Sequence, residues 1–227
     1  MGNNVISFIV AHPLDETLGA GGLIKKLSEL GWDIRVLSLT GEDSYFTSGI
    51  EEVIQNLGIS EYQTTEILPF EITENLVPKI IKFIMNTKPE VIVTHVPFDF
   101  HSDHSKTYHL VKDSVEWAAR TDISNKSWRV NKMLLMEIDT LISKPNLFID
   151  VSDYIDAKIE AINCYYKKLS KPDFFYKEFT RIKARLRGLQ FNSEYAEAFI
   201  VEFIDISGPF YDRKRVETVL NDIFHID

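Results

Sequence analysis

The sequence of 227 residues contains one cysteine, more acidic than basic residues, and no long apolar run. A single thiol cannot form an internal disulfide, which fits a reducing compartment, and we expect Cys164 to lie in the core. Lys and Arg number 25 against 34 Asp and Glu, giving a formal net charge of -9. That charge disfavours nucleic acid and anionic membrane surfaces as partners. The first apolar run is too short for a bilayer span or a signal-peptide core, so we expect a cytoplasmic protein with no membrane partner.

The sequence also lacks internal repeats, low-complexity tracts and Gly/Ser linkers, the features that usually mark domain boundaries. Its length lies within the range of one α/β domain. We therefore predict a single domain over residues 1–227.

Segments with strand and helix patterns alternate along the first hundred residues. Gly31 and Gly58 follow two of the helical patterns, as glycine commonly does at helix ends, and Thr73 suits the N-cap of the third. The predicted strands cover residues 5–11, 33–40, 64–70 and 90–96, and the predicted helices cover residues 17–31, 50–57 and 73–89. This alternation is typical of βαβ units and predicts an α/β fold with a mainly parallel sheet covered by helices on both faces.

Two dense clusters of His and Asp, residues 12–16 and 95–104, each follow a predicted strand. Ligands of open parallel sheets gather beyond the carboxyl ends of the strands, so we expect both clusters in one crevice. His12 and Asp15 offer two metal ligands from one turn, and His101 or His104 offers a third, which leaves a position open at a catalytic zinc. We expect His95 and His109 to be structural or exposed residues and not metal ligands.

Glycines at 19, 21 and 22 raise a second interpretation, a dinucleotide site. The spacing is not G-x-G-x-x-G and comes too late after the strand. We expect these small residues to let a helix pack closely against the sheet.

Four segments resemble the LmbE-like, or PIG-L, family of metal-dependent N-deacetylases. "AHPLDETLGAGG" resembles the A-H-P-D-D-E signature, and "DFHSDH" resembles the D-x-H-x-D-H motif. "DVSDYIDAKIEAINCY" (150–165) is similar to a Lys-bearing helix of the family, and "RGLQFNSEYAEAF" (187–199) to its closing segment with Tyr-Ala-Glu. The resemblance implies a Rossmann-like fold and a Zn²⁺-dependent hydrolase that removes acetyl groups from amino sugars such as N-acetylglucosamine.

The resemblance also implies roles for individual residues. His12, Asp15 and His104 would be the metal ligands. His101 would face the substrate carbonyl or the leaving amine, and Asp103 would orient His101. The partner would be a small amino-sugar substrate. The sequence leaves open whether the protein forms a homo-oligomer.

Leu14 departs from the family pattern, because the family has its general-base Asp at this position. Leucine cannot accept a proton, so either another group replaces the base or the protein is a catalytically impaired or inactive relative that binds metal and a sugar ligand. Glu16 is the nearest carboxylate and the first candidate replacement, with Asp99 and His101 as rivals. The alternative role of Glu16 is a supporting or helix-capping acid.

A basic, aromatic stretch over residues 165–188 allows two interpretations. One is an amphipathic helix with Phe175, Phe179, Ile182 and Leu186 inward. The other is a phosphate clamp formed by Arg181 and Arg185, which lie four residues apart and would share a helix face. A clamp would favour a nucleotide-linked or phosphorylated sugar as substrate.

Overall fold

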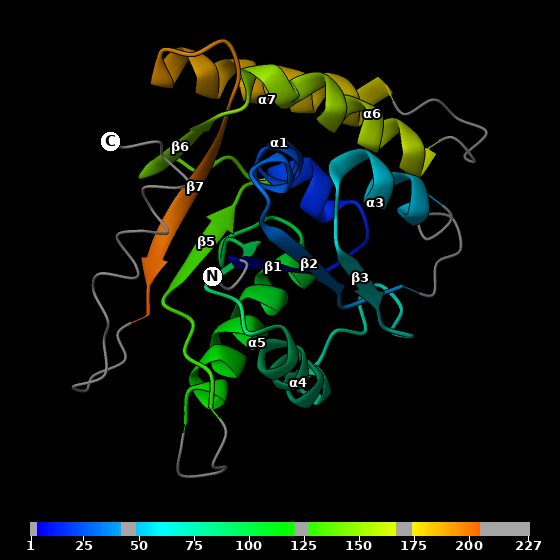
Figure 1. Ribbon diagram of the computed structural model, residues 1–227, viewed down its shortest axis with the longest axis vertical. Helices are drawn as coiled ribbons and strands as arrows, with labels where there is room; N and C mark the ends of the chain where they lie inside the picture. The colour runs from blue at the N-terminus through cyan, green and yellow to red at the C-terminus, as the bar shows by residue number, and fades with distance from the viewer. Residues whose placement is uncertain (1–3, 42–48, 121–126, 167–173, 205–227) are drawn as a thin grey trace.

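The computed structural model describes residues 4–41, 49–120, 127–166 and 174–204 (Figure 1). In these residues seven strands form one sheet in the order β3-β2-β1-β4-β5-β7-β6. The strands are β1 (Val5–Val10), β2 (Asp33–Ser38), β3 (Glu61–Thr64), β4 (Val91–His95), β5 (Lys132–Met136), β6 (Leu147–Asp150) and β7 (Ala196–Phe203). The helices are α1 (Asp15–Glu29), α3 (Ile50–Leu57), α4 (Val77–Thr87), α5 (Ser102–Ala118), α6 (Ile155–Tyr166) and α7 (Phe174–Phe191), with 3-10 turns η1 (Glu74–Leu76) and η2 (Ser152–Tyr154).

Strands β3, β2, β1, β4 and β5 are parallel neighbours, whereas β7 runs antiparallel to both β5 and β6. Helices α1, α3, α6 and α7 lie on one side of the sheet and α4 and α5 on the other (Figure 1). The predicted α/β architecture, a mainly parallel sheet with helices on both faces, is confirmed.

Each face of the sheet buries its own apolar core, as the alternation of side chains along a strand requires. In β1, Ile6, Phe8 and Val10 belong to the core under α1, α3 and α6. Ile9, which points to the opposite face, belongs to the core under α4 and α5. Cys164 is buried in the first of these cores, as expected.

Two of the glycines in α1 sit where a larger residue would collide with its neighbours. A Cβ added at Gly22 would lie 2.7 Å from Val151 Cβ, and one added at Gly19 would overlap Met136. The Gly22 amide also donates to Glu197 Oε1 at 2.8 Å. The expectation that these glycines permit close helix packing is confirmed.

The third strand begins earlier than the sequence pattern predicts. β3 covers Glu61–Thr64 and pairs with β2, whereas the prediction placed a strand over residues 64–70. Pro69 has no amide hydrogen to donate to a neighbouring strand, and Leu68 and Phe70 are exposed instead of packed. The apolar residues that suggested a strand thus lie in a loop. Thr73 does precede η1, but its side chain makes no capping hydrogen bond.

Helix α7 presents the opposite face to the one its apolar residues predict. Phe175, Ile182 and Leu186 are exposed, which contradicts the expectation that they point inward, and Phe179 is only partly buried. The buried side chains include Lys183 and Arg187.

The reason for this orientation lies in the loop that follows β5. Lys183 Nζ donates to the Glu137 and Ile138 carbonyls at 2.8 and 3.2 Å, and Arg187 donates to both Glu137 carboxylate oxygens and to the Ile142 carbonyl. Buried polar groups require such partners, because leaving them without hydrogen bonds costs more than exposing an apolar side chain. The spacing of apolar residues along the helix does not show which polar side chains will have buried hydrogen-bond partners.

None of the helices in the described ranges combines the length and the apolar character needed to cross a membrane.

Candidate metal centre

The two His/Asp clusters meet where β1 and β4 end side by side. β1 and β4 are adjacent parallel strands, and the chain continues from β1 toward β2 and β3 on one side and from β4 toward β5 on the other. Strand order therefore reverses between them, which is the usual ligand-binding position in such sheets. His12 follows β1, His95 ends β4, and His101 caps the N-terminus of α5. The two clusters thus lie together at the ends of these strands.

Asp15 lies at the centre of this cluster, in the first turn of α1. Its Oδ2 atom lies 3.3 Å from His12 Nδ1, 3.4 Å from His104 Nε2 and 3.5 Å from His95 Nε2. The same oxygen accepts the His12 backbone amide at 2.8 Å. One carboxylate oxygen therefore contacts three imidazoles from three different segments.

Two of these separations are those expected between ligands of a tetrahedral divalent cation. With bond lengths of about 2.1 Å, a tetrahedral site places neighbouring ligand atoms about 3.4 Å apart, close to the two separations from Asp15 to His12 and His104. Nitrogen and carboxylate oxygen are also the donor types that zinc accepts. The structure thus places His12 and His104 next to Asp15 within a His/Asp cluster that could bind a metal ion, and the choice of these three residues as its ligands stays a prediction.

Other donor sets share the same region. Ligand atoms of His12, His101 and His104 lie within 4.8 Å of one another, as do those of Asp15, His95 and His104 and those of Asp99, His104 and Asp139. His95 Nε2 already accepts the Ala11 amide at 2.9 Å, which favours the structural role expected for His95. His104 belongs to all three sets, so it is the ligand that every arrangement shares.

Burial and charge act in opposite directions on the pKa values of this cluster. Burial alone would raise the pKa of Asp15, but His104 and His12 outweigh it and hold that pKa well below its usual range. Burial would lower the pKa of His104, but Asp15 and Asp99 raise it to about 10. Burial, together with His104, holds the pKa of His95 well below its usual range. Asp15 is therefore charged at neutral pH and suited to hold a cation.

Two further carboxylates lie near Nδ1 of His104, the ring nitrogen that does not face Asp15. Asp99 Oδ1 lies 3.2 Å from His104 Nδ1, and Asp139 Oδ2 lies 3.8 Å from the same atom. Such carboxylates orient a metal-binding imidazole. The sequence analysis did not predict Asp139 as a site residue. It follows β5 as His12 follows β1, so recognising β5 would have drawn attention to it.

His101 and Asp103 are adjacent in space, but not in the way the family resemblance implies. The Asp103 backbone amide donates to His101 Nδ1 at 3.2 Å, so the ring proton of neutral His101 lies on Nε2. The Asp103 carboxylate instead contacts His12 Nε2 at 3.2 Å and accepts the Phe70 amide at 2.6 Å. Asp103 therefore positions His101 through its backbone and His12 through its side chain.

Leu14 lies between His12 and Asp15 in the sequence but belongs to the apolar core. Its side chain is 4% exposed and packs in the apolar core under α1, and its backbone φ is 91°. Such positive φ values are uncommon outside glycine, asparagine and aspartate. Position 14 therefore supplies no proton acceptor and carries backbone strain.

Glu16 is fully buried among hydroxyl groups. Oε1 accepts Thr17 Oγ1 at 2.7 Å and the Tyr165 hydroxyl at 2.8 Å, and Oε2 accepts the Tyr62 hydroxyl at 3.1 Å. Burial raises the pKa of Glu16. Since these three hydroxyls satisfy the carboxyl group, the arrangement favours the supporting role over that of a replacement base.

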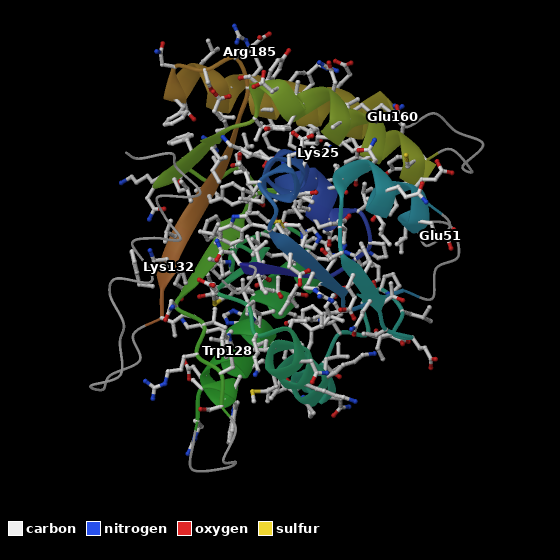
Figure 2. All side chains as sticks on the ribbon, viewed as in Figure 1. Lys25, Glu51, Trp128, Lys132, Glu160 and Arg185 are labelled. Atoms are coloured by element: carbon white, nitrogen blue, oxygen red, sulfur yellow. The ribbon has the colours of Figure 1, made fainter. Side chains whose placement is uncertain are left out.

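Arg181 and Arg185 contact other parts of the chain. Arg181 Nη2 lies 3.2 Å from Asp156 Oδ1 on α6, and Arg185 Nη1 donates to the Glu194 carbonyl at 2.8 Å. Figure 2 shows Arg185 on the outer side of α7. The phosphate clamp stays a prediction, because a bound phosphate would have to compete with these contacts.

Comparisons with known proteins agree with the fold and with the family resemblance. Residues 7–115 match the family described as PIG-L, GlcNAc-PI de-N-acetylase. The diacetylchitobiose deacetylase of Thermococcus kodakarensis is 25% identical over 213 residues, covering 83% of this chain and 79% of the relative.

Two solved structures illustrate the range of proteins with this fold. N,N'-diacetylchitobiose deacetylase from Pyrococcus horikoshii superposes with a TM-score of 0.77 at 23% identity, covering 92% of this chain and 88% of that one. GalB, the 4-carboxy-2-hydroxymuconate hydratase from Pseudomonas putida KT2440, superposes with a TM-score of 0.76 at 19% identity, covering 92% and 100%.

Proposed function

Because residues 7–115 match the PIG-L family, we propose that this chain is a zinc-dependent hydrolase that removes the N-acetyl group from an amino sugar or a sugar conjugate. The observation that carries the proposal is the position of Asp15 Oδ2, 3.3 Å from His12 Nδ1 and 3.4 Å from His104 Nε2. The match to a deacetylase over most of both chains supports the reaction type.

His12, Asp15 and His104 would hold the ion. Asp103 contacts His12 and Asp99 contacts His104, in each case at the ring nitrogen that does not face Asp15, and these contacts would orient the two imidazoles. When bound there, zinc supplies a Lewis acid that polarises the amide carbonyl and activates water. The protein contributes the fixed geometry, since all five side chains come from the ends of neighbouring strands and from the first turns of α1 and α5.

His101 supplies a hydrogen-bond donor to the reacting group. Its Nδ1 accepts the Asp103 amide, so the neutral ring can donate a hydrogen bond from Nε2–H to the oxyanion that develops on the carbonyl. Its side chain is less buried than that of His104, which leaves it accessible to a substrate.

The second candidate function is a catalytically impaired or inactive relative that binds metal and a sugar ligand. It is favoured by Leu14, which puts an apolar, buried side chain where the family resemblance implies a general base. The fold also carries different chemistry in the hydratase described above. Metal binding alone therefore does not decide between the two functions.

Metal analysis combined with acetate release separates these functions. The purified protein is expected to bind one zinc per chain and to release acetate from at least one compound in a panel of N-acetylated amino sugars, their disaccharides and nucleotide-linked forms. Zinc binding without acetate release would support the second function. Failure to bind zinc would remove the hydrolase proposal.

A further inference from the structure

Helix α7 presents a regular apolar stripe to solvent. Successive members are separated by four, three, four and three residues, and Phe179 alone among them is partly buried: Phe175 (64% exposed), Phe179, Ile182 (63%), Leu186 (42%) and Leu189 (66%). We call these five residues the α7 seam. Apolar residues that repeat in this way form the seam of a coiled coil, which two helices bury against each other. Single exposed apolar residues are common, whereas a contiguous apolar stripe marks an interaction surface.

The contacts of α7 with its own protomer keep the seam outside. Lys183 and Arg187 lie away from the seam and are buried, where Lys183 donates to the Glu137 carbonyl and Arg187 to the Glu137 carboxylate. A Cβ added at Gly188 would lie 2.5 Å from the Glu194 carbonyl oxygen, so the backbone is closely packed on this side as well. Turning the seam inward would break these hydrogen bonds and expose the groups that make them. Only another molecule can therefore bury the seam.

The seam is spaced so that two copies of it fit each other. Phe175, Phe179, Ile182 and Leu186 lie symmetrically about the link between residues 180 and 181. A two-fold axis at that point makes the helices antiparallel. It places Phe179 against Ile182 of the second copy and Phe175 against Leu186 of the second copy, and it repeats each contact, as a two-fold interface requires.

The charges beside the seam agree with the same arrangement. Glu178 and Arg185 each directly precede a seam residue, Phe179 and Leu186, so both lie on the same flank, and both are exposed. Figure 2 shows Arg185 on the outer side of the helix. The antiparallel register brings Glu178 close to Arg185 of the second copy, and the two-fold axis forms this pair twice. Charged pairs at such flanking positions set partner choice and orientation in coiled coils.

An anionic membrane surface is the main rival for this face, because basic amphipathic helices bind such surfaces. Two of the basic residues of α7, Lys183 and Arg187, are however turned into the protein and satisfied there. The net charge of -9 also repels anionic lipid. A second copy of the chain fits better, because both the spacing of the seam and its flanking charges complement themselves.

We propose that α7 is a dimerisation helix, which pairs antiparallel with α7 of a second copy and buries the α7 seam. This inference concerns assembly and does not depend on the proposed catalytic function. From Phe175 to Leu189 the seam spans about 21 Å of helix. Because such an interface is short, we expect a reversible association whose extent depends on protein concentration.

Analytical ultracentrifugation of the full chain over a range of concentrations tests the seam. Ile182→Asp removes two isoleucines from the interface at once and places two carboxylates there. It should raise the dissociation constant by about a hundred-fold or more and halve the mass of the assembly at concentrations where the wild type is paired. Trp117→Asp is the matched control, since Trp117 is 47% exposed on α5, on the other side of the sheet, and should leave the association unchanged.

A charge exchange tests the antiparallel register with substitutions of exposed residues only. Glu178→Arg alone and Arg185→Glu alone each place like charges opposite one another and should weaken the association by about ten-fold. The double variant Glu178→Arg/Arg185→Glu should recover the wild-type dissociation constant. Lys177→Glu is the control, since it reverses a charge on the side of the helix away from the seam.

Several results would overturn the proposal. They are a wild-type protein that stays monomeric up to its solubility limit, an association that Ile182→Asp leaves unchanged, and a double variant no better than the two single ones. Co-sedimentation with phosphatidylserine vesicles tests the rival. Vesicle binding by the monomer that Ile182→Asp abolishes would assign the seam to a membrane surface instead.

Discussion

Leu14 combines two features that rarely coincide, a buried apolar side chain and a positive φ of 91°. Backbone strain of this kind costs about 1–3 kcal/mol and is offset here by burial in the core under α1. Aspartate and asparagine tolerate positive φ better than leucine does. The backbone at position 14 thus has a conformation that an aspartate would tolerate better than the leucine present there.

Leu14→Asp is expected to raise deacetylation turnover by about a hundred-fold or more, because a positioned general base contributes about a hundred- to ten-thousand-fold. The measurement is kcat for acetate release by the zinc-loaded protein. Leu14→Asn is the matched control, since it has the same size and backbone preference but no basic carboxylate. A similar rate in both variants would mean that the proton acceptor lies elsewhere.

At the scale of elements, a buried ion pair joins three parts of the chain. Lys158 Nζ on α6 lies 2.6 Å from Glu197 Oε1 on β7, and the Glu197 carboxylate also accepts the Gly22 and Leu23 amides of α1. Lys158 and Glu197 belong to the two C-terminal segments that resemble the family. These segments therefore hold α1, which carries Asp15, against the sheet.

Glu197→Gln is expected to destabilise the protein by about 3–5 kcal/mol, because it leaves the Lys158 ammonium buried without a counter-charge. Urea unfolding measures the change. Asp156→Asn is the control, since it removes the exposed contact with Arg181 and should change stability by less than about 1 kcal/mol. Equal effects of the two substitutions would contradict the structural role of the buried pair.

Lys183, on α7, makes the free energy of unfolding of the protein depend on pH. Burial, reinforced by Lys158, lowers the pKa of Lys183 to about 8. Between about pH 8 and the usual lysine value near 10.4 the unfolded chain binds a proton that the folded protein does not, so this residue makes stability rise with pH. Across this range Lys183 raises the free energy of unfolding by about 3 kcal/mol at most.

Lys183→Met should remove that rise. The measurement is the free energy of unfolding of the wild type and the variant from pH 7.5 to 10.5, whose difference isolates the residue from all other titrating groups. Lys177→Met is the matched deletion of a lysine on the same helix. A wild-type stability that falls as steeply as that of Lys183→Met over this range would contradict a lowered pKa.

The elements that the sequence predicts well are those with strong periodicity and clear end signals. α3 matches the predicted helix, and Gly58 follows it with a φ of 74°. The 64–70 strand and the inward face of α7 were wrong because tertiary hydrogen bonds, including those of Lys183 and Arg187, decide those segments. Strands β5, β6 and β7 were not predicted, and with them the antiparallel position of β7 and the role of Asp139 were missed.

The site is more predictable than its surroundings. Two motifs at the ends of adjacent parallel strands bring His12, Asp15 and His104 together, because strand order and direction fix where those ends meet. Phe70 had no such signal, since a loop after an edge strand reaches the site through contacts with Asp103 and His101 that no sequence pattern indicates. Residues placed by strand ends follow from sequence, and residues placed by long loops do not.

For the whole molecule, the concentration of acidic side chains at one edge of the sheet makes folding and metal binding interdependent. Asp15, Asp99 and Asp103 are buried close together in a protein of net charge -9. A bound dication would offset their mutual repulsion, and a ligand that binds only the folded state stabilises it.

Zinc is therefore expected to raise the thermal midpoint of unfolding and a chelator to reverse the increase. Free zinc at a hundred times its dissociation constant corresponds to about 2.7 kcal/mol of stabilisation. His104→Ala should abolish the shift, because His104 belongs to every candidate ligand set. His109→Ala is the matched control, since His109 is exposed on the same helix, α5, and belongs to none of those sets. Similar zinc-induced shifts in the two variants would show that the stabilising ion binds away from the strand ends, and the assignment of the metal centre would then be wrong.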